Sequence, residues 1–249
     1  MSPRALAALA FLLLLLSPSP EALAGSVSGS VVFRGEPPTL PPIEVLKDRE
    51  TCGQSVPSDA LVVSPKNGGV RNTVVSIEGV PAPAQGEPGE VVLENRRCRF
   101  VPHVIALRVG AELAIVNGDP VLHNLRAWLA EAQRNVLNVV QPNQGQETRR
   151  TIKRPGVMAL TCDTHVHMAG HILAFDHPYF AVTGEDGGFR IDGVPPGTYR
   201  ITAWHEGWTV LRRTPEGRPV YAPPHVLSRS VTVPDTGGVQ VVFELPASR

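Results

Sequence analysis

The chain has 249 residues, with 23 basic and 23 acidic side chains, so its formal net charge at pH 7 is zero. This balance, without a dense cluster of Lys and Arg, argues against nucleic-acid binding. Its 25 prolines and 23 glycines are about a fifth of the chain and argue against long helices. The length is sufficient for one large domain or two small ones.

The first 24 residues have the layout of a secretory signal peptide. Arg4 precedes an apolar run from Ala5 to Leu16, and Ala22-Leu23-Ala24 offers small residues for cleavage before Gly25. The run is shorter than the roughly 20 residues that a membrane-spanning helix needs. We therefore expect a periplasmic or secreted protein that starts at Gly25 and has no membrane span. An uncleaved anchor helix is the alternative.

Short apolar runs separated by turn residues follow along the chain. They are rich in Val, Ile, Leu and Phe, as strands are. This pattern predicts an all-β sandwich or barrel. The clearest runs are SVVF (30–33), LVVS (61–64), TVVSI (73–77), EVVLE (90–94), VIALRV (104–109) and ELAIVN (112–117).

The three cysteines, Cys52, Cys98 and Cys162, are an odd number for an exported protein. One of them must be free, shared between chains or bound to a metal. Cys162 is the one that lies beside other metal-binding side chains.

A candidate metal motif occupies residues 155–171, PGVMALTCDTHVHMAGH. A short strand opened by Pro-Gly predicts that Cys162 lies near the strand's end. His165 and Met168 then follow at intervals of three, in a loop short enough to return both side chains toward the sulfur. His123 lies in a second loop, directly after the apolar run ELAIVN.

The four residue types favour copper. A thiolate and two imidazoles in a trigonal set, with a weak thioether on the axis, suit both copper oxidation states. Zinc accepts Cys and His but gains little from a thioether. The alternative is a structural one, in which Cys162 is a small buried hydrophobe and Met168 fills the core.

The two motifs together resemble the cupredoxin family, and the Cys-x-x-His-x-x-Met spacing is similar to that of its amicyanin-like and plastocyanin-like members. Pro155-Gly156, Phe100-Val101-Pro102 and Asn117-Gly118-Asp119 extend the match. The resemblance implies a Greek-key β-sandwich with one type 1 (blue) copper ion held by His123, Cys162, His165 and Met168. It also implies that the side chain of Asn124 ties the two ligand loops together without binding the metal.

Three further histidines depart from this pattern or lie near it. His167 stands where related loops carry an aromatic or other apolar residue, and His171 follows closely. Either one offers a competing or second metal site, or simply faces solvent. His103 begins a strand near the expected ligand loops and has a possible role close to the copper.

A disulfide is expected between Cys52 and Cys98. If the metal binds Cys162, only these two cysteines remain, and an oxidising compartment favours their pairing.

The flanking segments indicate a second small sandwich. Residues 181–208 have a strand-turn-strand rhythm that resembles a carboxypeptidase-regulatory or transthyretin-like module, with 26–34 as its first strand and 239–245 as its last. The copper domain is then an insertion, unless the whole chain is one enlarged sandwich. The combination resembles exported proteins of the methylamine-utilisation type, from which no methylamine chemistry follows.

The resulting domain prediction has three parts after the signal peptide at 1–24. Residues 25–80 form an N-terminal β segment that packs with the C-terminal module, 81–177 form the cupredoxin-like copper domain, and 178–249 form the carboxypeptidase-regulatory-like module.

The leading functional hypothesis is one-electron transfer with a redox protein as donor or acceptor. It places the edge of His165 near the surface. The alternatives are copper binding and delivery, favoured by His167 and His171, and a non-redox interaction module. An enzyme is not expected, since a copper oxidase or reductase needs further metal centres and an open coordination position.

Overall fold

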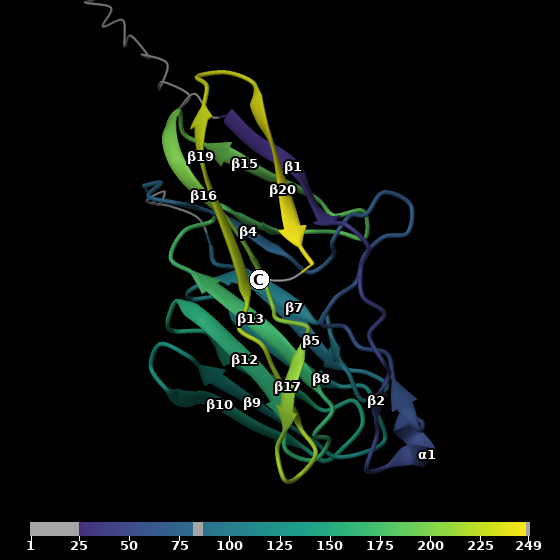
Figure 1. Cartoon of the computed structure of the whole chain (residues 1–249). Coiled ribbons are helices and arrows are strands. Elements are labelled where there is room, and N and C mark those ends of the chain that lie inside the picture. Colours follow the sequence, from purple (N-terminus) through teal and green to yellow (C-terminus); the bar gives the residue numbers. More distant parts are fainter. Residues whose placement is uncertain (1–24, 82–86, 248–249) are drawn as a thin grey trace, which may run out of the picture.

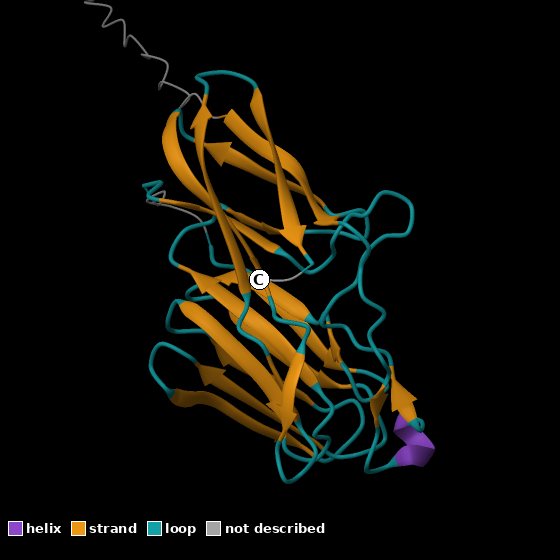
Figure 2. Cartoon of the chain, viewed as in Figure 1, coloured by secondary structure: helices purple, strands orange, loops and turns teal. Residues whose placement is uncertain are grey.

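The computed structural model describes residues 25–81 and 87–247. The predicted signal peptide lies outside these residues. Strands account for nearly all the regular structure, as Figure 2 shows, and the described residues include one short helix, α1 (Arg49–Cys52). In this part of the chain no helix has the length and apolar character needed to cross a membrane. The predicted all-β class is confirmed.

Two sandwiches lie one above the other in Figure 1. The upper one, here called the terminal sandwich, is built from both ends of the described chain. One of its sheets has the order β15 (Gly188–Val194), β1 (Gly25–Arg34), β20 (Gly238–Pro246), and the other has the order β14 (Phe180–Val182), β4 (Val74–Glu78), β16 (Gly197–His205), β19 (His225–Val233).

The first and last strands pair in the terminal sandwich. β1 and β20 run parallel, with Val31 opposite Phe243. Alternate residues of both strands point inward, as a period of two requires, and Val27, Val31 and Phe243 are buried in one apolar core. Gly29 lies so close to β20 that a Cβ would overlap a carbonyl oxygen. The second small sandwich expected from the sequence is therefore present.

The lower, central sandwich comes from the middle of the chain. Its five-stranded sheet has the order β10 (Arg134–Gln141), β9 (His123–Leu129), β12 (Gly156–Cys162), β13 (Ala169–Phe175), β7 (Val104–Arg108). Its four-stranded sheet has the order β11 (Glu147–Thr151), β8 (Glu112–Asn117), β5 (Glu90–Asn95), β6 (Phe100–Val101). Large side chains that are fully buried between the sheets include Leu93, Phe100, Ile115, Leu125 and Leu160.

Two segments cross from one sandwich to the other. The N-terminal part leaves β1 and forms β2 (Ile43–Glu44), α1 and β3 (Ser55–Val56), whose Val45 and Val56 join the core of the central sandwich. The predicted grouping of all of 25–80 with the C-terminal module differs from the structure, in which this segment contributes to the cores of both sandwiches. The hairpin of β17 (Val210–Arg213) and β18 (Pro219–Tyr221) extends from the terminal sandwich onto the central one (Figure 1).

A small apolar cluster joins the sandwiches. Val74 and Trp204 from the terminal sandwich pack with Val104 and Leu173 from the central one. Since each sandwich has its own larger core, the chain has two modules with a shared seam rather than one enlarged sandwich.

Candidate metal centre

Three donor atoms meet at one end of the central sandwich. His123 begins β9 and Cys162 ends β12, and these neighbouring strands pair with Cys162 opposite Leu125. His165 follows in the turn before β13. The Cys162 sulfur lies 4.0 Å from Nδ1 of His123 and 3.9 Å from Nδ1 of His165, and the two nitrogens are 3.2 Å apart. All three residues are buried.

These separations fit a trigonal metal ion. Imidazole nitrogen binds such an ion at about 2.05 Å and thiolate sulfur at about 2.3 Å. With those bond lengths, the observed separations correspond to angles of about 130° for each sulfur–nitrogen pair and about 100° for the nitrogens. The three angles would sum to about 360°, so a single ion could contact all three donors. The donor set therefore fits a metal.

The Cys162 sulfur is surrounded by donors. The backbone N–H groups of Asn124 and His165 each donate to it at 3.4 Å. Burial raises the pKa of the thiol, but the imidazoles of His123 and His165 and the two N–H groups lower it further, to about 6. The thiolate, which is the form that binds metals, is thus favoured at neutral pH.

Met168 lies one turn beyond His165. Its N–H donates to the His165 carbonyl at 2.9 Å, which closes the short loop expected from the spacing. The side chain is 2% exposed and belongs to the same core cluster as Cys162.

A carboxylate contacts the far ring nitrogen of each of these two histidines. Nε2 of His123 lies 3.0 Å from Oδ2 of Asp119, and Nε2 of His165 lies 3.0 Å from Oδ2 of Asp48. Such carboxylate–imidazole pairs fix the ring and raise its basicity toward a metal. Neither aspartate was predicted. Asp119 precedes His123 by four residues and could have been suspected, whereas Asp48 is 117 residues from His165 and gave no local signal.

Asp119 is itself firmly placed. Its two oxygens accept the N–H groups of Arg97 and Cys98, and its own N–H donates to the Asn117 side chain. Burial raises the pKa of Asp119, but the hydrogen bonds from His123, Cys98 and Arg97 hold it below the usual range. Burial lowers the pKa of His123, while Asp119 and Cys162 together raise it to about 9.

His165 is covered, so the expectation that its edge lies near the surface is wrong. Its side chain is 0% exposed, whereas that of Asp48 is 32% exposed. Asp48 precedes α1 with a left-handed backbone (φ 55°) and makes no side-chain hydrogen bond to the helix. Its carboxylate thus serves His165 instead of capping α1.

Asn124 connects the two ligand loops through its backbone. Its N–H donates to the Cys162 sulfur, and its carbonyl accepts the N–H of Asp163 at 3.2 Å. Its side-chain amide donates to Asn138 on β10 at 2.9 Å. The family resemblance had implied a tie through the side chain.

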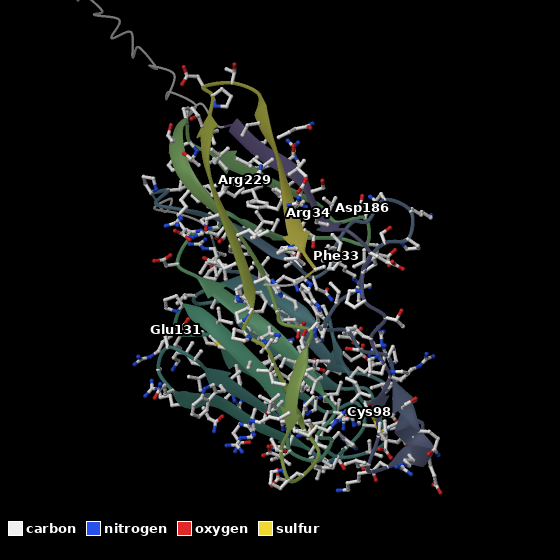
Figure 3. All side chains as sticks on the ribbon, viewed as in Figure 1. Phe33, Arg34, Cys98, Glu131, Asp186 and Arg229 are labelled. Atoms are coloured by element: carbon white, nitrogen blue, oxygen red, sulfur yellow. A yellow bond between two sulfur atoms is a disulfide. The ribbon has the colours of Figure 1, made fainter. Side chains whose placement is uncertain are left out.

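The predicted disulfide between Cys52 and Cys98 is confirmed, and Cys162 is the free cysteine. Figure 3 places Cys98 in the lower sandwich, beside helix α1. Both sulfurs lie within 4.8 Å of a ring nitrogen of His165. The disulfide therefore anchors α1, and with it Asp48, against the metal centre.

Two more contacts support the centre from outside. Nη2 of Arg218, in the β17–β18 hairpin, donates to the carbonyl of Cys162 at 2.7 Å. Nε2 of His167 lies 3.1 Å from the carbonyl oxygen of Cys98, and the residue is 4% exposed, so the solvent-facing placement considered for it is wrong. Burial, and to a lesser degree His165, lower the pKa of His167 to about 4.

The other two histidines singled out from the sequence lie in a separate cluster. His103 and His171 each place one ring nitrogen near Glu206, within 4.8 Å of one another. Glu206 was not predicted, because it follows β16 of the terminal sandwich and is 103 residues from His103.

Comparison with known proteins yields partial likenesses. A family model described as "Polysaccharide lyase family 4, domain II" matches residues 156–216, which is less than half of the chain and crosses from β12 to the β17–β18 hairpin. No curated protein matches.

Solved copper proteins resemble parts of the structure. The copper-containing nitrite reductase NirK from Thermus scotoductus is 25% identical over 39% of this chain and 25% of that chain, with a TM-score of 0.30. A mutant of amicyanin in the reduced Cu(I) form is 16% identical over 41% of this chain and 98% of its own, with a TM-score of 0.32. The purple cupredoxin from Nitrosopumilus maritimus is 18% identical over 35% of this chain and 99% of its own, with a TM-score of 0.29.

This chain thus spans a quarter of the nitrite reductase. All three TM-scores are low.

Proposed function

We propose that the protein binds one copper ion in a type 1 site through His123, Cys162 and His165, with Met168 as a weak fourth ligand, and transfers single electrons without turning over a substrate. The observation that carries this proposal is the buried set of one sulfur and two nitrogens at separations that fit a trigonal ion. Copper in such a set supplies a redox couple whose two states accept nearly the same ligand geometry.

The surrounding contacts support a rigid site. Asp119 and Asp48 hold the two rings, backbone N–H groups hold the sulfur, and Arg218 holds the carbonyl of Cys162. Ligands held in this way rearrange little when an electron arrives or leaves. Because both carboxylates make their imidazoles more basic, we expect them to stabilise Cu(II) over Cu(I) and lower the reduction potential.

The proposed docking surface for a redox protein lies over Asp48. This residue is bonded to a ligand ring and is itself partly exposed. Glu50 in the first turn of α1 adds a second acidic side chain beside it. Lys47 and Arg49, also exposed, alternate with these two acids, so the segment has no net charge and the proposed docking rests on the closeness of Asp48 to the ligand ring.

Copper delivery is less well supported by the contacts. That alternative depended on His167 and His171 as exchange ligands. His167 is turned to the Cys98 carbonyl, and His171 lies with His103 and Glu206.

The disulfide supports a periplasmic or secreted location, since such bonds persist in oxidising compartments.

Addition of Cu(II) to the purified chain tests the proposal. We expect one tightly bound copper and an intense thiolate-to-copper absorption band. Cys162→Ser should abolish the band even if imidazoles still hold some copper. His177→Gln, a histidine outside both clusters, is the matched control and should leave the band unchanged. Wild-type protein that binds Cu(II) without a thiolate band would contradict the proposal.

A further inference from the structure

A second group of donors lies where the two sandwiches meet. His103 comes directly before β7 and His171 lies on the adjacent β13, whose parallel pairing with β7 places His171 opposite Val104. The N–H of His171 donates to the His103 carbonyl at 2.9 Å, which keeps the two residues side by side. Glu206 comes directly after β16, on the terminal sandwich. The seam therefore brings together two imidazoles and one carboxylate.

The carboxylate faces both rings. Oε1 of Glu206 is in contact with Nε2 of His103, and Oε2 lies 3.7 Å from Nδ1 of His171. The Glu206 side chain is only 5% exposed. Burying a carboxylate this deeply is costly unless a cation or several donors satisfy it.

One nitrogen of the cluster has no hydrogen-bond partner. A pair of His103 and Glu206 accounts for one oxygen, but Nδ1 of His171 is buried and has no hydrogen-bond partner. The ring is nevertheless held in place, with its centroid 5.1 Å from that of Trp204 in an edge-on contact.

Open space adjoins the donors on one side. A cavity of about 230 Å³ is lined by His171, Trp204, Glu206, Arg218 and Tyr221, among others. Arg218, one of the lining residues, has a buried Nη1 without a hydrogen-bond partner. A metal at the three donors would therefore have room for a water or a small anion as a further ligand.

We propose that His103, His171 and Glu206 form a second metal site, for a divalent ion of the zinc type, with an open coordination position toward this cavity. Two imidazoles and a carboxylate without a thiolate are a ligand set of catalytic zinc sites, which keep one position for water or substrate. An ion there accounts for the unpartnered nitrogen and neutralises the buried carboxylate. It also links the sandwiches, since Glu206 belongs to one and both histidines to the other.

This site is chemically distinct from the first. The thiolate and thioether near His123 select copper, whereas nitrogen and oxygen donors suit Zn²⁺ and related divalent ions. A cavity of about 20 Å³, lined by both Met168 and Glu206, lies between the two groups of residues. The second proposal stands independently of electron transfer at the first centre.

The test uses the full chain with its thiolate site already filled by one equivalent of Cu(II). Equilibrium dialysis against Zn²⁺, followed by elemental analysis, should give one zinc per chain in addition to the copper. Co²⁺ in place of Zn²⁺ should give weak visible bands without a cobalt-thiolate transition, which reports nitrogen and oxygen ligands.

Variants locate the ion. His171→Gln removes a ring nitrogen that has no hydrogen bond, so the fold should persist, and it should lose the second equivalent while the copper-thiolate band stays unchanged. Glu206→Gln should do the same. His177→Gln should keep both metals. Cys162→Ser should still bind one zinc at the second site.

Two results would overturn the proposal. One is copper-loaded wild-type protein that takes up no zinc or cobalt. The other is His171→Gln and Glu206→Gln variants that both retain the second equivalent.

Discussion

The two groups of histidines use their carboxylates in opposite ways. At the first centre, Asp119 and Asp48 lie behind the rings of His123 and His165, and the Nδ1 atoms turn toward Cys162. At the second, Glu206 lies in front of the rings of His103 and His171, among the donor atoms themselves. A carboxylate bonded to the ring nitrogen that faces away from the metal position raises the basicity of that imidazole. A carboxylate that lies among the donor atoms is itself available as a ligand. The first centre thus offers a metal a thiolate and two imidazoles, and the second offers two imidazoles and a carboxylate, so the two are proposed to bind different metals.

Removing the disulfide, which lies beside the first centre, should have the largest effect and should affect that centre without affecting the second. Cys52→Ala combined with Cys98→Ala should lower the free energy of unfolding by about 4 kcal/mol, from the chain-entropy relation for a separation of 46 residues. Chemical denaturation of the metal-free variant measures this loss. The double variant should also bind copper more weakly, because the segment that holds Asp48 next to His165 is no longer fixed by the disulfide. Zinc binding at Glu206 should be unchanged. A loss below about 1 kcal/mol would show that α1 is held by packing alone.

Asp119→Asn tests the role of a carboxylate behind a ring. The amide keeps the shape but no longer raises the basicity of His123, so Cu(II) affinity should fall by about 10- to 100-fold and the reduction potential should rise. Competition with a chelator and voltammetry measure the two quantities. Asp48→Asn should act in the same direction but more weakly, because that carboxylate is partly exposed. An unchanged potential in both variants would assign the aspartates a purely structural role.

The metal-free protein should show an unusual titration at the first centre. With the pKa of Cys162 lowered from 9.0 to about 6, thiolate absorbance should rise as pH increases through about 6. This group stabilises the fold fully above its unfolded pKa, and that contribution is lost as pH falls through about 6. His123, with its pKa raised to about 9, has the opposite dependence and loses its contribution as pH rises through about 9. Ultraviolet titration, with Cys162→Ser as the blank, checks the midpoint; a midpoint near 9 would contradict the thiolate–imidazolium pair.

Met168 should give the smallest change. In the proposed site Met168 is the weak fourth ligand, which would adjust the balance between oxidation states without supplying the colour. Met168→Leu should raise the reduction potential and Met168→Gln should lower it, and both variants should keep the thiolate band. Met158→Leu, a buried methionine elsewhere in the same core, is the matched control. Loss of the band in Met168→Leu would mean that the thioether does more than tune the site.

The amino-acid sequence by itself determined the features that depend on neighbours along the chain. Alternating apolar runs predicted the strands, because side chains alternate between the faces of a strand. The spacing of Cys162, His165 and Met168 predicted one short loop, because chain connectivity keeps residues three apart within reach. The pairing of Cys52 with Cys98 followed once Cys162 was assigned to the metal.

Only the tertiary structure decided which distant groups complete each centre. Asp48 reaches His165 because the segment from β2 to β3 leaves the terminal sandwich and is held by the disulfide on the central one. Glu206 reaches His103 and His171 because the end of β16 meets the start of β7 at the seam. Aspartate and glutamate are common on any surface, so neither residue type nor local spacing marks these two. Folding places Asp48, which stays partly exposed, and Glu206, which is buried, each beside an imidazole, where an ordinary carboxylate becomes available to a metal site.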